Sequence, residues 1–202
     1  MSQYSPKNFQ HLKGTPGFSD KALDIHFTLY EGYVKNTNKL IEELEKLLAD
    51  GKSDTPEYAE MKRRFGWEFD GMRLHELYFS AMKNGGSELS KDSDLYKKIE
   101  VDFGSYSNWE KDFRAIGAMR GIGWAILYYD KIGDKLLNVW INEHNLGHLA
   151  GAVPLLPMDV FEHAFLIDYG TARAEYIEAF IKAVDWEEIV RTTDSHMISL
   201  RL

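Results

Sequence analysis

Apolar side chains recur at helical spacing over two long stretches in the first half of the chain. The first stretch runs from Asp20 to about Leu48, and Ser19 is well placed to cap its start. Its apolar positions are Leu23, Phe27, Tyr30, Val34 and Leu40. The second stretch runs from about Pro56 to Lys83, after a polar connection at residues 51–56. The pattern predicts an antiparallel pair of long helices.

The pattern changes near residues 84–94, where Gly, Asn, Ser and Asp cluster. Beyond this break it predicts short elements, with Gly133 suited to a tight turn between the first two strands. The expected helices are Asp94–Phe103, Ser107–Met119, Arg173–Val184 and Trp186–Thr192, and the expected strands are Trp124–Tyr129, Lys135–Ile141 and Val153–Met158. We therefore predict an α+β fold, in which an N-terminal helical hairpin domain (1–88) packs on a C-terminal α/β domain (89–202) with a three-stranded antiparallel sheet.

Composition narrows the functional classes. Of the 202 residues, 44% are apolar and 13% aromatic, which is enough for a substantial core. The chain has no cysteine, so thiolate ligands and disulfides are excluded. A net charge of −8 argues against nucleic-acid binding. Neither a signal-peptide pattern nor an apolar run of about 20 residues is found, so we expect a cytoplasmic protein without membrane association.

The segment after the third expected strand carries candidate chemistry. The apolar run Val153–Pro157 leads to Asp159 and His163, which are four residues apart. Burying a carboxylate beside an imidazole is costly unless both find a partner, and a metal ion is such a partner. The alternative is a strand end with a solvated aspartate and a core histidine.

Two further histidines favour a metal site. His26 lies seven residues before Tyr33 on the first predicted helix, so the two share a face. His75 lies among large apolar residues of the second helix. One such histidine alone is more often a core residue. Three imidazoles and one carboxylate together suit iron or manganese, although zinc is also compatible with these ligand types.

Over nearly its whole length, the sequence resembles the iron/manganese superoxide dismutase family. The similarity rests on Leu12–Ser19 before His26, Tyr33-Val34-x-x-x-Asn38, Gly121-Ile122-Gly123-Trp124, Asp159-Val160-Phe161-Glu162-His163-Ala164 and Tyr169–Ile177. Phe161 stands where the family usually has Trp. The resemblance implies one iron or manganese ion per subunit and superoxide as substrate, converted to dioxygen and hydrogen peroxide. The implied metal ligands are His26, His75, Asp159 and His163.

The resemblance also implies which residues surround the metal. Tyr33 matches the gateway tyrosine beside the substrate channel, and Trp124 matches an apolar wall of the site. His144 stands where the manganese type usually has Gln, and Gly71 stands where the iron type usually has Gln. We expect His144 to hydrogen-bond the solvent at the metal; the alternative is a surface loop histidine. Its distance of fifteen residues from Asp159 resembles iron-type relatives, which gives a slight lean to iron with either metal possible.

Subunit contacts and steering residues are also implied. In the family, the glutamate matching Glu162 reaches across a two-fold axis to the partner's equivalent histidine, which suggests a homodimer or homotetramer. A usual inter-subunit His–Tyr contact is absent, because Leu29, Tyr30 and Glu31 replace its histidine region and Leu166 its tyrosine. Lys35 and Arg173 are candidates for attracting superoxide.

Two other functions are compatible with parts of this pattern. One is a metal-binding homologue of the same fold without dismutase turnover; retention of Tyr33 and Trp124 favours the enzyme over it. The other is a non-haem iron oxygenase, whose usual two histidines and one carboxylate fit four protein ligands poorly.

Overall fold

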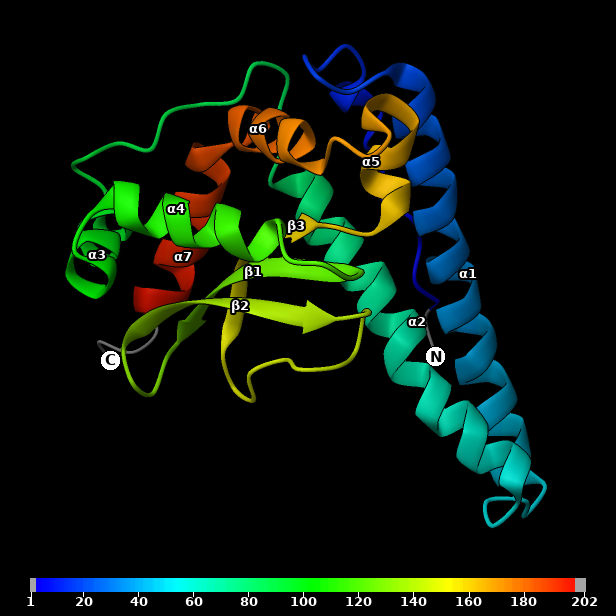
Figure 1. Ribbon diagram of the computed structural model, residues 1–202. Helices are drawn as coiled ribbons and strands as arrows, with labels where there is room; N and C mark the ends of the chain where they lie inside the picture. Colours follow the sequence, from blue (N-terminus) through cyan, green and yellow to red (C-terminus); the bar gives the residue numbers. More distant parts are fainter. Residues whose placement is uncertain (1–2, 199–202) are drawn as a thin grey trace.

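The computed structural model describes residues 3–198, and a long helical hairpin forms most of its first half (Figure 1). Helix α1 (Asp20–Ala49) starts where the Ser19 side chain accepts a hydrogen bond from the Ala22 N–H. Helix α2 (Pro56–Ser80) starts with the Thr55 side chain accepting from the Tyr58 N–H. A short 3-10 helix, η1 (Gln10–Leu12), precedes them. The predicted hairpin is confirmed.

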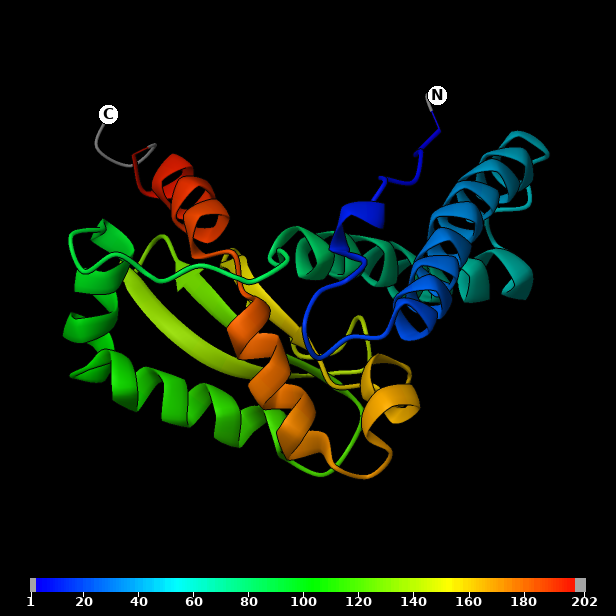
Figure 2. The ribbon, with the colours of Figure 1, turned by 90° about the horizontal axis from the view of Figure 1, so that it is seen from above.

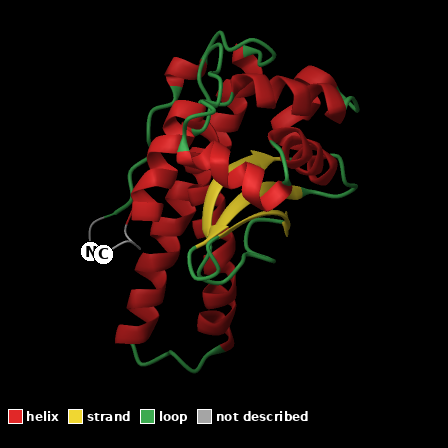
Figure 3. Ribbon diagram, turned by 90° about the vertical axis from the view of Figure 1, so that its left-hand side faces the viewer, coloured by secondary structure: helices red, strands yellow, loops and turns green. Residues whose placement is uncertain are grey.

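The second half of the chain forms a sheet between helices. Strands β1 (Gly123–Asp130), β2 (Lys135–Asn142) and β3 (Val153–Asp159) are antiparallel in the order β2-β1-β3. Helix α4 (Tyr106–Gly117) packs on β1 and β2, whereas α2 packs against β3. Helices thus surround the small sheet (Figure 3). The remaining helices are α3 (Asp94–Phe103), α5 (Glu162–Tyr169), α6 (Arg173–Ala183) and α7 (Trp186–Ile198). The predicted α+β class is confirmed.

Two local features differ from expectation. Helix α5 was not expected, because eight residues are too few to display a helical period. His163 therefore lies in the first turn of a helix and not at a strand end. In the turn between β1 and β2, Asp134 and not Gly133 takes a left-handed conformation, with φ of 46°. Aspartate tolerates this conformation better than most residues.

The sheet register fixes the position of the site. Trp124 on β1 pairs with Asp159 on β3, and the Val160 N–H donates to the Gly123 carbonyl at 2.9 Å. Gly123 has φ of +140°, and a Cβ there would lie 2.0 Å from the Ile141 carbonyl oxygen, so only glycine fits. This end of the sheet faces the hairpin, as the view from above shows (Figure 2).

One buried apolar cluster contains side chains from both sides of residue 88. The division into domains 1–88 and 89–202 stays a prediction. Among the described helices, none has both the length and the apolar character required to cross a membrane.

Candidate metal centre

Four potential ligands meet from four elements. His26 comes from α1, His75 from α2, Asp159 from the end of β3 and His163 from α5, and we call them the ligand cluster. Their candidate donor atoms all lie within 4.8 Å of one another. The Asp159 Oδ2 lies 3.0 Å from the Nε2 of His163, 3.2 Å from that of His26 and 3.5 Å from that of His75. The structure thus brings all four sequence-predicted ligands together.

Hydrogen bonds outside the cluster turn its donor atoms inward. The His75 Nδ1 lies 2.6 Å from the Gly71 carbonyl oxygen, which can only accept, so Nδ1 carries the hydrogen. Its Nε2 therefore has a free lone pair, and this buried atom has no hydrogen-bond partner. The Asp159 Oδ1 accepts from the Phe161 N–H at 2.8 Å, and the Asp159 carbonyl accepts from the Tyr176 hydroxyl at 2.5 Å. Oδ2 is left to face the imidazoles.

The spacing of these atoms fits a single metal ion. Donor atoms bound at about 2.1 Å with bond angles of about 90–120° lie about 3.0–3.6 Å apart. The three separations from the Asp159 Oδ2 fall in this range. A buried imidazole lone pair without a donor is costly, and a cation among these atoms would satisfy it. The four residues therefore fit the iron or manganese ion that this set of ligands implies.

Burial also prepares the protonation states that a metal needs. Burial lowers the pKa of His26 below its ordinary value, and it lowers the pKa of His75 well below it. For Asp159, burial alone would raise the pKa. Interactions with the nearby imidazoles of His163 and His26, hydrogen bonds among them, outweigh burial and hold the pKa of this carboxyl well below its usual range. Neutral His26 and His75 beside an ionised carboxylate are ready to bind a cation at neutral pH.

A directed hydrogen-bond chain lies beside the ligand cluster. The Trp124 indole N–H donates to the His144 Nδ1 at 3.1 Å, and the His144 Nε2 lies 2.7 Å from the Tyr33 hydroxyl oxygen. An indole can only donate, so His144 carries its hydrogen on Nε2 and donates it to Tyr33. The Tyr33 hydroxyl then has its own hydrogen left for another acceptor. We call this the Trp124–His144–Tyr33 chain.

His144 and Tyr33 are both uncharged at neutral pH. His144 is fully buried, which excludes the surface-loop alternative, and burial lowers its pKa to about 4. Burial also raises the pKa of Tyr33, so its hydroxyl keeps its hydrogen at neutral pH. The Tyr33 ring stacks on the His75 ring with centroids 5.2 Å apart. The chain thus touches the ligand cluster directly.

Several neighbours of His144 were not singled out in the sequence. The Trp67 ring from α2 meets His144 edge-on at 4.8 Å, and Arg64 lies over the Trp67 ring at 5.0 Å. Trp67 is eight residues before His75 and so shares its helical face, the one signal that could have indicated it. Phe161, noted only as a replacement for Trp, stacks on both His144 and His163.

The remaining predicted site residues lie near the surface. Glu162 is exposed at the start of α5, next to His163. Lys35 is exposed on α1. The Arg173 guanidinium donates to the carbonyl oxygens of Met119 and Gly121 at 2.6 and 2.8 Å, so it is tied to the backbone. The roles expected for these three residues stay predictions.

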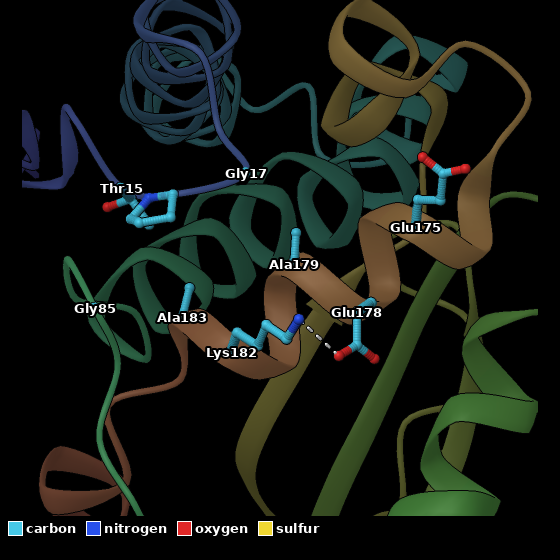
Figure 4. A pocket seen from close by; sticks show the side chains of 9 residues that line it. Thr15, Gly17, Gly85, Glu175, Glu178, Ala179, Lys182 and Ala183 are labelled. Carbon is cyan, nitrogen blue, oxygen red and sulfur yellow. Dashed lines mark ion pairs between the residues drawn. The ribbon is translucent and has the colours of Figure 1, made fainter.

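A hollow of about 360 Å³ lies elsewhere, between residues 15–17 and α6 (Figure 4). Its charged side chains include Glu178 and Lys182, which pair with each other at 3.1 Å. The residues that line it are Thr15, Pro16, Gly17, Gly85, Glu175, Glu178, Ala179, Lys182 and Ala183. None of them belongs to the ligand cluster, so the hollow is separate from the candidate centre.

The chain is similar in sequence to known proteins. A family model described as iron/manganese superoxide dismutases, C-terminal domain, matches residues 91–192. The chain is 36% identical to a protein named superoxide dismutase [Mn] from Haloarcula marismortui, over 93% of this chain and 94% of that protein. It is 34% identical to one named superoxide dismutase [Fe] from Aquifex pyrophilus, over 94% of this chain and 90% of that protein.

Proposed function

Because the chain belongs to the iron/manganese superoxide dismutase family, we propose that the ligand cluster is where it converts superoxide to dioxygen and hydrogen peroxide. Two superoxide anions and two protons yield one molecule of each product, so the chain is an oxidoreductase. A bound iron or manganese ion would supply the one-electron change of oxidation state that this reaction needs. The convergence of three imidazole nitrogens on the Asp159 Oδ2 carries this proposal.

The charge balance of the ligand cluster favours an anionic substrate. Neutral imidazoles and one carboxylate contribute a single negative charge, which leaves a divalent or trivalent cation with a net positive charge. The chain as a whole carries −8, so attraction must be local. Lys35 remains a candidate for steering because it is exposed, whereas Arg173 would have to act while bound to two carbonyl groups.

The proton donor to peroxide would be the Tyr33 hydroxyl, at the end of the Trp124–His144–Tyr33 chain. Tyr33 is only half-buried, so solvent can restore its hydrogen. We expected His144 to hydrogen-bond the solvent at the metal directly. Its one N–H is directed at Tyr33, so we propose that His144 acts chiefly through the Tyr33 hydroxyl. This hydroxyl keeps its hydrogen at neutral pH and can donate it to an anionic oxygen beside His75. Trp124 fixes the tautomer of His144 on which this direction depends.

Metal preference and assembly complete the proposal. Relatives named for manganese and for iron are similarly close to this chain. We lean slightly to iron, on the fifteen-residue interval between His144 and Asp159. We also propose a homodimer or homotetramer in which Glu162 reaches the partner. Support comes from α5, which packs beside α1 and exposes the apolar side chains of Leu166 and Ile167 next to Glu162.

The decisive experiment is a superoxide-decay assay on protein reconstituted separately with iron and with manganese, with metal content measured. We expect accelerated decay with at least one metal, and with metal-free protein no acceleration over the spontaneous decay of superoxide. Stoichiometric metal without accelerated decay for either ion would refute the proposal and would favour a metal-binding homologue without turnover.

A further inference from the structure

The segment that carries His144 contains a second histidine in a bridging position. The His148 Nε2 lies 2.7 Å from the His144 carbonyl oxygen, and its Nδ1 lies 2.5 Å from the Tyr128 hydroxyl oxygen. The carbonyl can only accept, so the His148 Nε2 carries the hydrogen. Its Nδ1 and the Tyr128 hydroxyl form the second bond. His148 thus links the central strand β1 to the backbone of His144.

The His144 segment has few other supports. Residues 143–152 form turns and bends between β2 and β3. One backbone pair, between Asn142 and Leu146, closes the turn, and Glu143 takes a left-handed φ of 54°. The peptide group of His144 is therefore not held by a sheet or helix ladder. The one side-chain hydrogen bond recorded to its carbonyl within the described residues comes from His148.

Small displacements of this peptide matter because the His144 ring is hydrogen-bonded to two partners on different elements, Trp124 and Tyr33. Its Nδ1 must stay near the Trp124 indole while its Nε2 stays near Tyr33, at 3.1 and 2.7 Å. Hydrogen bonds weaken steeply as distance and angle depart from these values. If the His144 ring rotated and lost the hydrogen bond from the Trp124 indole, its hydrogen would no longer be fixed on Nε2. The ring N–H would then no longer be directed at Tyr33.

We propose that His148 is a positioning residue, which holds the His144 peptide against β1 through Tyr128 and thereby keeps the His144 ring between Trp124 and Tyr33. The consequence for dismutation rests on the proposed function; the positioning itself does not. The His148 Nε2 also lies 3.9 Å from the Asp70 Oδ2 on α2, and the His148 ring meets the Tyr128 ring edge-on. None of these partners belongs to the ligand cluster, and a His144→Ala background tests whether the effect passes through His144.

The test begins with metal-free protein carrying nitrogen-15-labelled histidine. Nuclear magnetic resonance of the ring nitrogens reports which nitrogen of His144 bears the hydrogen. In wild type we expect it on Nε2. His148→Leu removes both bridging bonds and should shift or split the His144 signals. His148→Gln can still donate to the carbonyl and accept from Tyr128, so it should restore the wild-type pattern. His11→Leu, which removes an exposed histidine, is the matched control.

Activity per bound metal gives the second readout. We expect His148→Leu to lower kcat/KM for superoxide about 10-fold, the lower range for residues that support ligands from outside, with metal content unchanged. In a His144→Ala background the same substitution should add no further loss. Tyr128→Phe is a milder variant that keeps the ring and removes only the hydroxyl, in case His148→Leu does not fold. It should shift the His148 Nδ1 signal and perturb His144.

Two results would overturn the proposal. One is an unchanged His144 signal in both His148→Leu and Tyr128→Phe. The other is an equal loss of activity from His148→Leu in the wild-type and His144→Ala backgrounds. Altered His144 signals in the metal-free variants, together with a metal-loaded wild type that lacks activity, would instead refute the proposed function and support the positioning contact.

Discussion

The ligand cluster and His144 lie side by side, but different kinds of backbone hold them. The ligands come from two long helices, the end of a paired strand and a short helix. His144 comes from an irregular segment held by one backbone pair and by His148. Regular elements fix a side chain through many repeated bonds, whereas a loop depends on a few side-chain contacts. We therefore expect substitution of a ligand to abolish metal binding and activity. Substitutions around His144 should lower activity only in part.

The largest effect should follow loss of a ligand. We expect His75→Ala or His163→Ala to abolish stoichiometric metal binding and superoxide decay together, because each removes one of four protein donors. Metal content after reconstitution and activity are measured on the same samples, with His11→Ala as a control on an exposed histidine. Full metal and wild-type turnover in either variant would show that the ligand assignment is wrong.

Replacing His144 should have a graded effect. We expect His144→Gln to retain nearly all metal, to shift the reduction potential and to change the ratio of iron-supported to manganese-supported activity. His144→Ala should lower activity further, by about 10- to 100-fold, because it also leaves Trp124 and Tyr33 without their shared partner. Electrochemistry and both activities are compared with wild type. Unchanged potential and ratio would remove His144 from the site.

A substitution at Glu162 tests whether the ligand cluster depends on a partner subunit. Glu162 is exposed beside His163, and a carboxylate acceptor from a partner would orient that imidazole. We expect Glu162→Ala to weaken dimerisation and to lower activity about 10-fold. Sedimentation at several concentrations and the decay assay give the two readouts. A fully active monomer would contradict the expected contact across the two-fold axis.

The stability of metal-free protein should depend on pH through the buried histidines. The folded-state pKa values of His26, His75 and His144 all lie below 6.5, that of His144 at about 4. Below about pH 6.5 the unfolded chain binds protons that the folded chain does not, so the free energy of unfolding should fall as pH falls. Asp159, whose pKa is depressed, adds stability that is lost only below about pH 4.

Urea unfolding at pH 7.5 and pH 5 measures this dependence. His144→Gln removes one of these three titrating imidazoles. The free energy of unfolding should then change less between the two pH values. An equal free energy of unfolding at both pH values would show that these imidazoles are not buried as neutral groups in solution.

The smallest effects concern two glycines of α2. A Cβ at Gly71 would lie 2.7 Å from the Tyr33 ring, whereas one at Gly66 would meet only Asn145 at 3.6 Å. We expect Gly71→Ala to cost about 1–3 kcal/mol in urea unfolding, because the ring must shift. Gly66→Ala should stabilise by about 0.5–1 kcal/mol, because alanine favours the helix and fits. Equal effects would mean that Tyr33 is not pressed against α2.

Elements with a clear period could be predicted from sequence, and the ligands lie on or beside them. The two long helices end within three residues of their expected limits, because the apolar positions and caps mark them. Helix α5 has only eight residues and no detectable period, so the backbone around His163 could not be predicted. The turn at Asp134 was assigned to its neighbour, since glycine is the commoner left-handed residue.

The surroundings of His144 were harder to predict than the ligands. Its bond to Tyr33 joins residues 111 positions apart and depends on how a loop folds back over the hairpin. No local pattern encodes such a contact. Nothing in the sequence marks His148, because its partners are a carbonyl group and a strand tyrosine that carries no motif. Only the tertiary structure shows that both of its ring nitrogens are engaged.

The narrow space at Gly71 also limits how the sequence could change over time. The resemblance noted above places the usual glutamine of the iron type at this position and that of the manganese type at His144. A side chain at residue 71 would collide with Tyr33, whose position His144 helps to fix. If residues 71 and 144 were replaced one at a time, the intermediate variant would have either a polar side chain at both positions or one at neither. In this chain, exchanging one arrangement for the other therefore requires a paired replacement at residues 71 and 144.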